Sequence, residues 1–236
     1  MAESPRELPL KLEKVETTLP FTFRHRPVDK PKLLVLFLHG YSDHGGSFLK
    51  RLFQDQWPES FARAAVLAPN GPFPVPVKSE TGWREAYAWY FYDEKAGEMM
   101  ISPETAVRGC EQLIQKFGYE QIPKVIVGFS QGGFLAPHLA THLNGVREII
   151  GIATGFREAY YPLSSEAPAI SEVTPWTVTG IQGSDDEVFP LAETRAAHAA
   201  LLRRGYSGEF VEIPKLTHVA SPEVGSVVAD RIQTWI

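Results

Sequence analysis

Residues 124–133 read KVIVGFSQGG, and the residues that follow, FLAPHLATHL (134–143), have the composition of a helix. The first part is apolar and β-branched, as in a strand that is buried on both faces. The passage therefore predicts a strand that turns at once into a helix, with Ser130 at the turn. This strand–turn–helix context is the one that G-x-S-x-G requires to hold a nucleophilic serine on a tight turn. Glycines flank the serine because a Cβ would collide where the chain doubles back.

The rest of the chain alternates short apolar segments with longer helical patterns. Strands are predicted at 32–39, 62–69, 147–154, 174–183 and 208–214. Helices are predicted at 46–57, 103–118 (capped by Ser102, with Pro103 first), 131–142, 190–205 and 222–236, and residues 69–101 are expected to be irregular. This alternation predicts an α/β fold with a mostly parallel central sheet and helices on both faces.

The N-terminal region has a different pattern. Residues 10–26 contain two strand-like pieces with alternating apolar residues, which predict a ribbon at the sheet edge within residues 1–31. A chain of 236 residues can bury one α/β core, so we expect a single domain over 1–236.

Composition limits the classes of function. Hydrophobic residues make up 44% and charged residues 22%, as in ordinary globular proteins, and the net charge of −5 argues against nucleic acid as a partner. The longest apolar run, 33–38, is too short to span a bilayer, and no secretory signal is visible. The single Cys110 excludes an intrachain disulfide and is expected to be a packing thiol. Together these features favour a cytoplasmic protein, and a homodimer stays open.

A nucleophilic serine needs a neighbouring base, and in a fold of this type the base is expected in a loop that follows a strand. Beyond the helix that follows Ser130, the chain offers His198 and His218. His198 lies within a strongly helical run, where a packed or solvated position is expected. His218 follows the last predicted strand and a short loop, so we predict that it is the base.

The acid should lie in GSDDEVFP (183–190), which closes another predicted strand. Its carboxylate must orient the imidazole and stabilise the imidazolium without taking its proton. Spacing alone does not separate Asp185 from Asp186, and part of this acidic cluster has a natural role in forming the turn.

Two backbone N–H groups are expected to stabilise the oxyanion. Gln131 opens the helix after the serine, where unpaired N–H groups point outward. The second donor should come from the loop after the first buried strand, and we assign it to Tyr41. His39, Asp43 and His44 in the same loop suggest a metal site, but structural hydrogen bonds are the better interpretation, so neither metal nor cofactor is predicted.

The sequence resembles the phospholipase/carboxylesterase group of α/β-hydrolases, which includes the acyl-protein thioesterases. The resemblance lies in LHGYSD (38–43), LAPNGP (67–72), VGFSQGG (127–133), GSDDEVFP (183–190) and TH (217–218). In that group the catalytic aspartate stands four residues before a proline, which selects Asp186, four before Pro190. The residue after His-Gly supplies an oxyanion N–H in the group, which corresponds to Tyr41.

One region departs from the group. Residues 82–94, GWREAYAWYFYDE, are longer and more aromatic than the corresponding loop. We predict that Trp89 or Phe91 walls an acyl pocket; the alternative is that these aromatic residues only cover the sheet.

The function expected from these residues is hydrolysis of carboxylic esters with small to medium acyl chains, through an acyl-enzyme on Ser130. The partner would be a small ester or thioester. The alternatives are a thioesterase or lysophospholipase acting on longer chains, or a binding module that has lost catalysis. Binding modules of this kind usually lack one member of the catalytic triad, and none is missing here.

Overall fold

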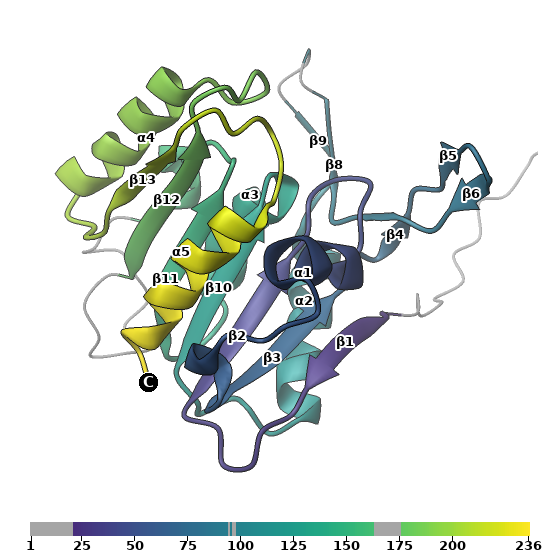
Figure 1. Ribbon diagram of the computed structural model, residues 1–236, viewed down its shortest axis with the longest axis vertical. Helices are drawn as coiled ribbons and strands as arrows, with labels where there is room; N and C mark the ends of the chain where they lie inside the picture. The colour runs from purple at the N-terminus through teal and green to yellow at the C-terminus, as the bar shows by residue number, and fades with distance from the viewer. Residues whose placement is uncertain (1–20, 94, 96–97, 163–175) are drawn as a thin grey trace, which may run out of the picture.

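The computed structural model describes residues 21–93, 95, 98–162 and 176–236 (Figure 1). Its centre is a seven-stranded sheet with the strand order β1-β3-β2-β10-β11-β12-β13. The strands are β1 (Phe23–Arg26), β2 (Leu33–Leu38), β3 (Ala64–Pro69), β10 (Lys124–Phe129), β11 (Val146–Ile152), β12 (Thr177–Gly183) and β13 (Phe210–Ile213). All neighbouring pairs are parallel except β1 and β3, which are antiparallel. The prediction of a mostly parallel sheet is confirmed.

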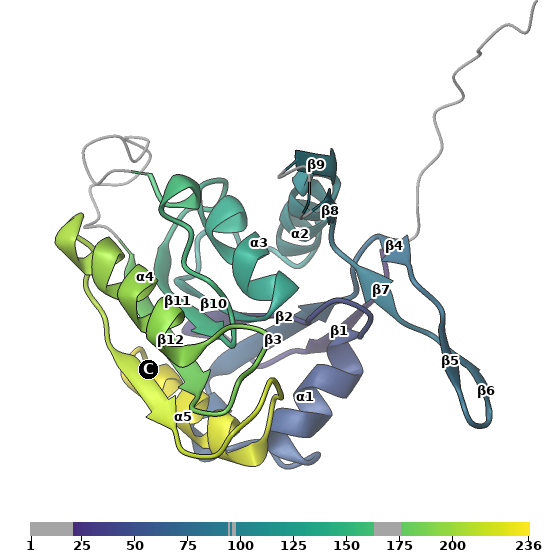
Figure 2. The ribbon, with the colours of Figure 1, turned by 90° about the horizontal axis from the view of Figure 1, so that it is seen from above.

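In the described part of the chain, five α-helices cover the two faces of this sheet (Figure 2). They are α1 (Gly45–Phe53), α2 (Glu104–Lys116), α3 (Gln131–Ala140), α4 (Leu191–Arg203) and α5 (Pro222–Gln233). One apolar cluster joins α1 and α5 to one face, and a second cluster joins α2, α3 and α4 to the other. The strands therefore need apolar residues on both sides, which explains their nearly continuous apolar sequences.

Strand β2 shows this arrangement directly. Leu34 and Leu36 belong to the cluster beneath α2 and α3, whereas Val35 and Phe37 belong to the cluster beneath α1 and α5. None of the four is more than 1% exposed. Each such side chain contributes about 1.5–3 kcal/mol to folding, so β2 anchors the loop that follows it.

The N-terminal prediction is tested only in part, because residues 1–20 lie outside the described residues. Strand β1 occupies the end of the predicted ribbon and forms the antiparallel edge, with Phe23 opposite Pro69 and Arg26 opposite Val66.

Residues 69–101 were expected to be irregular, and this was wrong in part. The region forms three short antiparallel ribbons, which pair β4 (Phe73–Pro74) with β7 (Tyr87–Ala88), β5 (Val77–Ser79) with β6 (Gly82–Arg84), and β8 (Phe91–Asp93) with β9 (Glu98–Ile101). The β5–β6 ribbon projects from the body of the molecule in both views (Figures 1 and 2). Strands of two to four residues are too short to produce a recognisable alternation in the sequence.

Helix ends also differ from the predictions. Helix α1 ends at Phe53, before the predicted residue 57, because Gln54 and Asp55 have left-handed backbones with φ of 48° and 63°. Helix α2 begins at Glu104 with Pro103 at the N-cap position, so Ser102 is not the cap.

Candidate active site

Ser130 lies on the turn between β10 and α3, with φ 49° and ψ −114°. A positive φ is strained for a residue with a side chain, and such strain is typical of a nucleophile held on a tight turn. The neighbouring glycines make the turn possible. A Cβ on Gly128 would lie 2.4 Å from the carbonyl oxygen of Gly132, and one on Gly132 would lie 2.1 Å from that of Leu38.

A chain of hydrogen bonds starts at this serine. Ser130 Oγ lies 3.1 Å from Nε2 of His218, and Nδ1 of His218 lies 2.9 Å from Oδ2 of Asp186. A carboxylate only accepts hydrogen bonds, so Nδ1 carries the proton and Nε2 accepts the bond from the serine hydroxyl. In this tautomer the imidazole can remove the hydroxyl proton.

The loop after β12 fixes Asp186. Its Oδ1 accepts hydrogen bonds from the N–H groups of Val188 and Phe189, both at 2.9 Å, and its Oδ2 accepts another from Gln182 Nε2 at 2.8 Å. Asp186 is only 4% exposed. Asp185, by contrast, is exposed and accepts a hydrogen bond from Ser184 Oγ. The structure therefore brings Asp186, and not Asp185, to the imidazole.

Gln182 was missed in the sequence. It is 1% exposed, and its Nε2 also donates to the carbonyl oxygen of Phe189 at 2.8 Å. It thus links β12 to the loop that presents Asp186. The available signal was a glutamine near the end of a strand that was expected to be buried, where a side-chain amide needs hydrogen-bond partners.

Tyr41 and Gln131 lie on the two segments that approach the serine. A Cβ on Gly40 would lie 3.5 Å from Ser130 Cβ, so the loop after β2 packs directly against the turn. In the described part of the chain, the N–H of Tyr41 has no hydrogen-bond acceptor. Gln131 is the first residue of α3, where N–H groups lack acceptors within the helix. These two donors are available to an oxyanion.

The side chain of Gln131 has a separate role that sequence reasoning missed. Its Oε1 accepts from the N–H of Trp89 at 3.0 Å, and its Nε2 donates to the carbonyl oxygen of Tyr90 at 2.9 Å. The amide thereby fixes the aromatic segment beside the serine turn.

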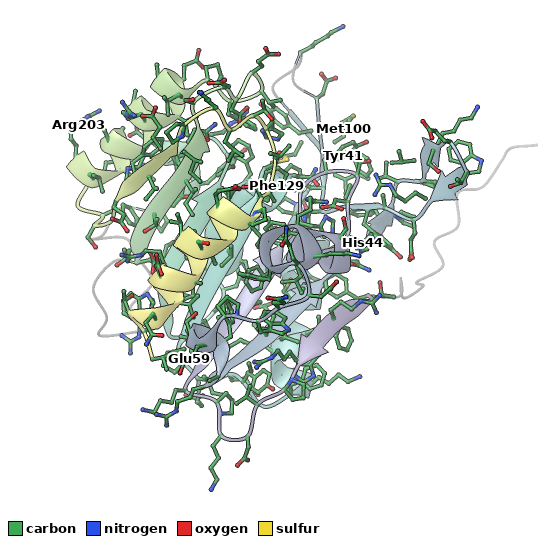
Figure 3. All side chains as sticks on the ribbon, viewed as in Figure 1. Tyr41, His44, Glu59, Met100, Phe129 and Arg203 are labelled. Carbon is green, nitrogen blue, oxygen red and sulfur yellow. The ribbon has the colours of Figure 1, made fainter. Side chains whose placement is uncertain are left out.

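A pocket of about 460 Å³ opens beside Ser130. It is lined by Tyr41, Tyr90, Phe91, Tyr92, Met99, Met100, Ser130, Gln131, Phe134, Arg157, Tyr160, Val188 and Phe189. Tyr41 and Met100 lie near each other above the carboxyl ends of the strands (Figure 3). The lining is mostly apolar, as is usual for sites that bind small molecules.

The structure separates the two aromatic residues that were candidates for the pocket wall. Phe91 lines the pocket, whereas Trp89 is not among the described residues that line it. Trp89 is fully buried, its ring packs against that of His39 with centroids 4.6 Å apart, and its Nε1 donates to the His39 carbonyl oxygen at 2.7 Å. A buried indole N–H requires such an acceptor, and this one lies in the core.

The three candidate metal ligands after β2 have other partners. His39 donates from Nδ1 to the Gly40 carbonyl oxygen and accepts at Nε2 from the Gly71 N–H, and burial lowers the pKa of His39 to about 4. Asp43 forms an ion pair with Arg51, and His44 caps α1 by accepting from the Ser47 N–H. Within the described ranges, no three His, Cys, Asp or Glu side chains are grouped to hold a metal ion.

The other histidine that was considered as the base lies apart from this site. His198 is 2% exposed and hydrogen-bonds through Nε2 to the carbonyl oxygen of Val178 at 2.7 Å, so of the packed and solvated positions that the sequence left open it occupies the packed one. Cys110 is fully buried in α2, and burial raises the pKa of its thiol.

Comparison with known proteins identifies the family and agrees with the fold. The sequence model of the family described as Phospholipase/Carboxylesterase matches residues 24–236. The chain belongs to the phospholipase/carboxylesterase family. The predicted resemblance is thus confirmed, and this member of the family is a hydrolase of the esterase and thioesterase type.

Individual relatives are distant. The phospholipase/carboxylesterase chain is 23% identical over 216 residues to acyl-protein thioesterase 1 homolog 1 of Dictyostelium discoideum, covering 89% of this chain and 93% of the relative. The crystal structure of esterase PE8 matches with a TM-score of 0.67 and 21% identity, covering 92% of this chain and 99% of the other. Zea mays acyl-protein thioesterase 2 matches with a TM-score of 0.63 and 17% identity, covering 91% and 98%. These structures confirm the α/β-hydrolase fold.

Among the residues that the structure describes, no helix combines the length and the apolar character needed to cross a membrane.

Proposed function

We propose that the protein hydrolyses carboxylic esters of small to medium acyl chains through an acyl-enzyme on Ser130. The observation that carries this proposal is the hydrogen-bonded chain from Ser130 through His218 to Asp186, in which Ser130 lines a mostly apolar pocket. A hydroxyl with an adjacent base, itself oriented by a carboxylate, is the arrangement that activates a serine.

The first half of the reaction forms the acyl-enzyme. Ser130 Oγ attacks the ester carbonyl carbon while His218 Nε2 takes the hydroxyl proton. The N–H groups of Tyr41 and Gln131 stabilise the oxyanion, and Asp186 stabilises the imidazolium. The bond between the carbonyl carbon and the alkoxy oxygen then breaks, and the alcohol leaves with the proton from His218.

The second half releases the acid. His218 takes a proton from a water molecule, whose oxygen attacks the acyl carbon. The bond to Ser130 Oγ then breaks, and His218 returns the proton to the serine. Side chains and backbone N–H groups supply each step, so the proposal calls for no metal or cofactor.

The size and lining of the pocket support the acyl preference. A pocket of about 460 Å³ lies in the range of sites that enclose small ligands. Phe91, Met99 and Met100 give it an apolar wall suited to a short alkyl chain.

The test is Ser130→Ala, assayed on p-nitrophenyl esters and by labelling with a fluorophosphonate probe. We expect kcat to fall by at least ~10³-fold and labelling to disappear, while the folded structure is retained. Ser226→Ala is the matched control, because this exposed hydroxyl on α5 bonds only to the Pro222 carbonyl oxygen among the residues that the structure describes. Wild-type turnover in Ser130→Ala would refute the proposal.

Thioester hydrolysis on longer chains is the second candidate. It is favoured by the similarity to proteins named acyl-protein thioesterases, one in Dictyostelium discoideum and one in Zea mays. The same triad serves both reactions, so the discriminating measurement is kcat/KM for matched esters and thioesters with acyl chains of graded length. A maximum at long-chain thioesters would select this function over the first.

A further inference from the structure

The pocket beside Ser130 contains one cation. Among the described residues that line it, Arg157 is the only one with a formally charged side chain. Arg157 lies in the loop between β11 and the short 3-10 helix Glu158–Tyr160, and its side chain is exposed at the rim. A charged residue in a lining that is otherwise uncharged calls for an explanation in terms of what the pocket binds.

Aromatic rings hold this guanidinium in place. Its central carbon lies 4.9 Å from the ring centroid of Tyr92, 5.3 Å from that of Phe134 and 5.9 Å from that of Tyr160. Its Nη1 lies 3.5 Å from the hydroxyl of Tyr160. Ring faces attract a cation through their quadrupoles, and three of them restrict where the side chain can point.

The rings supply no negative charge. Among the described residues, no carboxylate forms an ion pair with Arg157; the adjacent Glu158 instead lies 3.8 Å from Arg204. The positive charge at the pocket therefore has no protein counter-ion in the described part of the chain. A guanidinium that is stacked on rings still presents its N–H groups at its edge, in a fork that matches the two oxygens of a carboxylate or phosphate.

The surroundings are also suited to an anion. Tyr90, Tyr92 and Tyr160 line the same pocket, and each carries a hydroxyl that can donate a hydrogen bond. The pocket thus has an apolar wall formed by Phe91 and the two methionines and a second region made of one guanidinium and three phenols.

Ring contacts connect this region to His218, the proposed base. Phe134 contacts Arg157 and also Phe189, whose centroid lies 5.5 Å away, and Phe189 lies 5.6 Å from the imidazole of His218. Two rings therefore separate the guanidinium from the base. A single substrate molecule could therefore place its ester at Ser130 and an anionic group at Arg157. The anionic group would lie several bonds from the ester carbonyl carbon.

We propose that Arg157 selects substrates that carry an anionic oxygen group, a carboxylate or a phosphate, distal to the ester that is cleaved. This inference rests on the proposed ester hydrolysis at Ser130. Because Arg157 is exposed at the rim, its contribution is moderate and weakens as salt concentration rises.

The test compares matched pairs of substrates. In the carboxylate arm, mono-p-nitrophenyl hexanedioate is compared with p-nitrophenyl hexanoate, which lacks the terminal carboxylate. In the phosphate arm, hexanoylglycerol phosphate is compared with hexanoylglycerol. The measured quantity is the ratio of kcat/KM for the anionic member to that for the neutral member of each pair.

Arg157→Gln should lower this ratio about tenfold in the arm that matches the natural anion, mainly through KM, and Arg157→Lys should recover part of the loss. Arg203→Gln is the matched control for net charge, because Arg203 lies on α4, well away from Tyr41 and Met100 at the pocket (Figure 3). This control should leave both ratios unchanged. Ratios in Arg157→Gln that equal those of the wild type in both arms would overturn the proposal.

A binding measurement separates this proposal from the proposed catalysis. Monomethyl hexanedioate and hexyl phosphate are titrated calorimetrically into the Ser130→Ala variant, which needs no turnover. Adding Arg157→Gln should weaken the binding of at least one probe about tenfold, whereas adding Arg203→Gln should not. No measurable binding of either probe, or equal affinities with and without Arg157, would overturn the anion site whether or not the wild type hydrolyses esters.

Discussion

The carboxylate of Asp186 lies 2.9 Å from Nδ1 of His218, although 32 residues separate the two in the chain. Asp186 follows β12, and His218 follows the neighbouring parallel strand β13. The carboxyl ends of parallel strands lie at one edge of the sheet, which is why two loops so far apart in sequence meet there.

Replacing each of the adjacent aspartates tests this relationship. Asp186→Asn should lower kcat by several orders of magnitude, because an amide favours the wrong imidazole tautomer and does not stabilise the imidazolium; in a serine protease the same replacement costs ~10⁴-fold. Asp185→Asn should stay near wild type, since this exposed side chain bonds only to Ser184 Oγ among the described residues. Turnover of a p-nitrophenyl ester by both variants is the measurement, and the reverse pattern would assign the role to Asp185.

Gly132→Ala should destabilise the protein and lower turnover together. The added Cβ would lie 2.1 Å from the carbonyl oxygen of Leu38, so β2 or the serine turn must move. Overpacking of this kind costs about 1–3 kcal/mol of unfolding free energy, measured by urea denaturation. Gly46→Ala in α1 is the control, because the nearest atom is 3.2 Å away on the flexible side chain of Arg24. It should be neutral or stabilising, and similar losses in both variants would contradict the argument.

Trp89 and Phe91 should respond differently to substitution. Trp89→Phe removes the hydrogen bond to the buried His39 carbonyl oxygen and should cost about 1–3 kcal/mol of stability without changing the preference among acyl chains. Phe91→Ala enlarges the pocket and should shift that preference toward longer chains. Thermal or urea unfolding measures the stability of each variant, and kcat/KM over a series of esters measures its preference among acyl chains. A changed acyl preference in Trp89→Phe would restore Trp89 as a wall of the pocket.

Acid should weaken the fold through His39. Burial lowers the pKa of His39 from 6.5 to about 4, so between these pH values the unfolded chain binds more protons than the folded one. The free energy of unfolding therefore falls as pH falls through this window, by at most about 1.4 kcal/mol per pH unit for one group. Burial also lowers the pKa values of His138 and His198, which adds to the slope in the wild type.

His39→Asn isolates this contribution. Urea unfolding at several pH values from 4 to 7 should give a smaller slope for His39→Asn than for the wild type, whatever its stability at pH 7. His142→Gln, at an exposed position just after α3, should keep the wild-type slope. An unchanged slope in His39→Asn would show that another group controls acid stability.

The sequence by itself determined the architecture and the position of the serine. Strands that are buried on both faces are apolar throughout, and the serine turn needs glycines on both sides. Both features can therefore be recognised from a short stretch of sequence. Of the two histidines beyond the helix that follows Ser130, only His218 follows a strand end, so it could be chosen as the base. The family resemblance, rather than spacing, selected Asp186.

Only the tertiary structure decided which side chains share the pocket. The aromatic stretch gave no sign that Trp89 turns inward to His39 while Phe91 faces the substrate space, because loop dihedrals and not a repeating period set these directions. Arg157 and Gln182 were likewise inconspicuous in the sequence. Their partners come from other strands and loops, and contacts between segments distant in the chain become visible only once the sheet has brought its strand ends together.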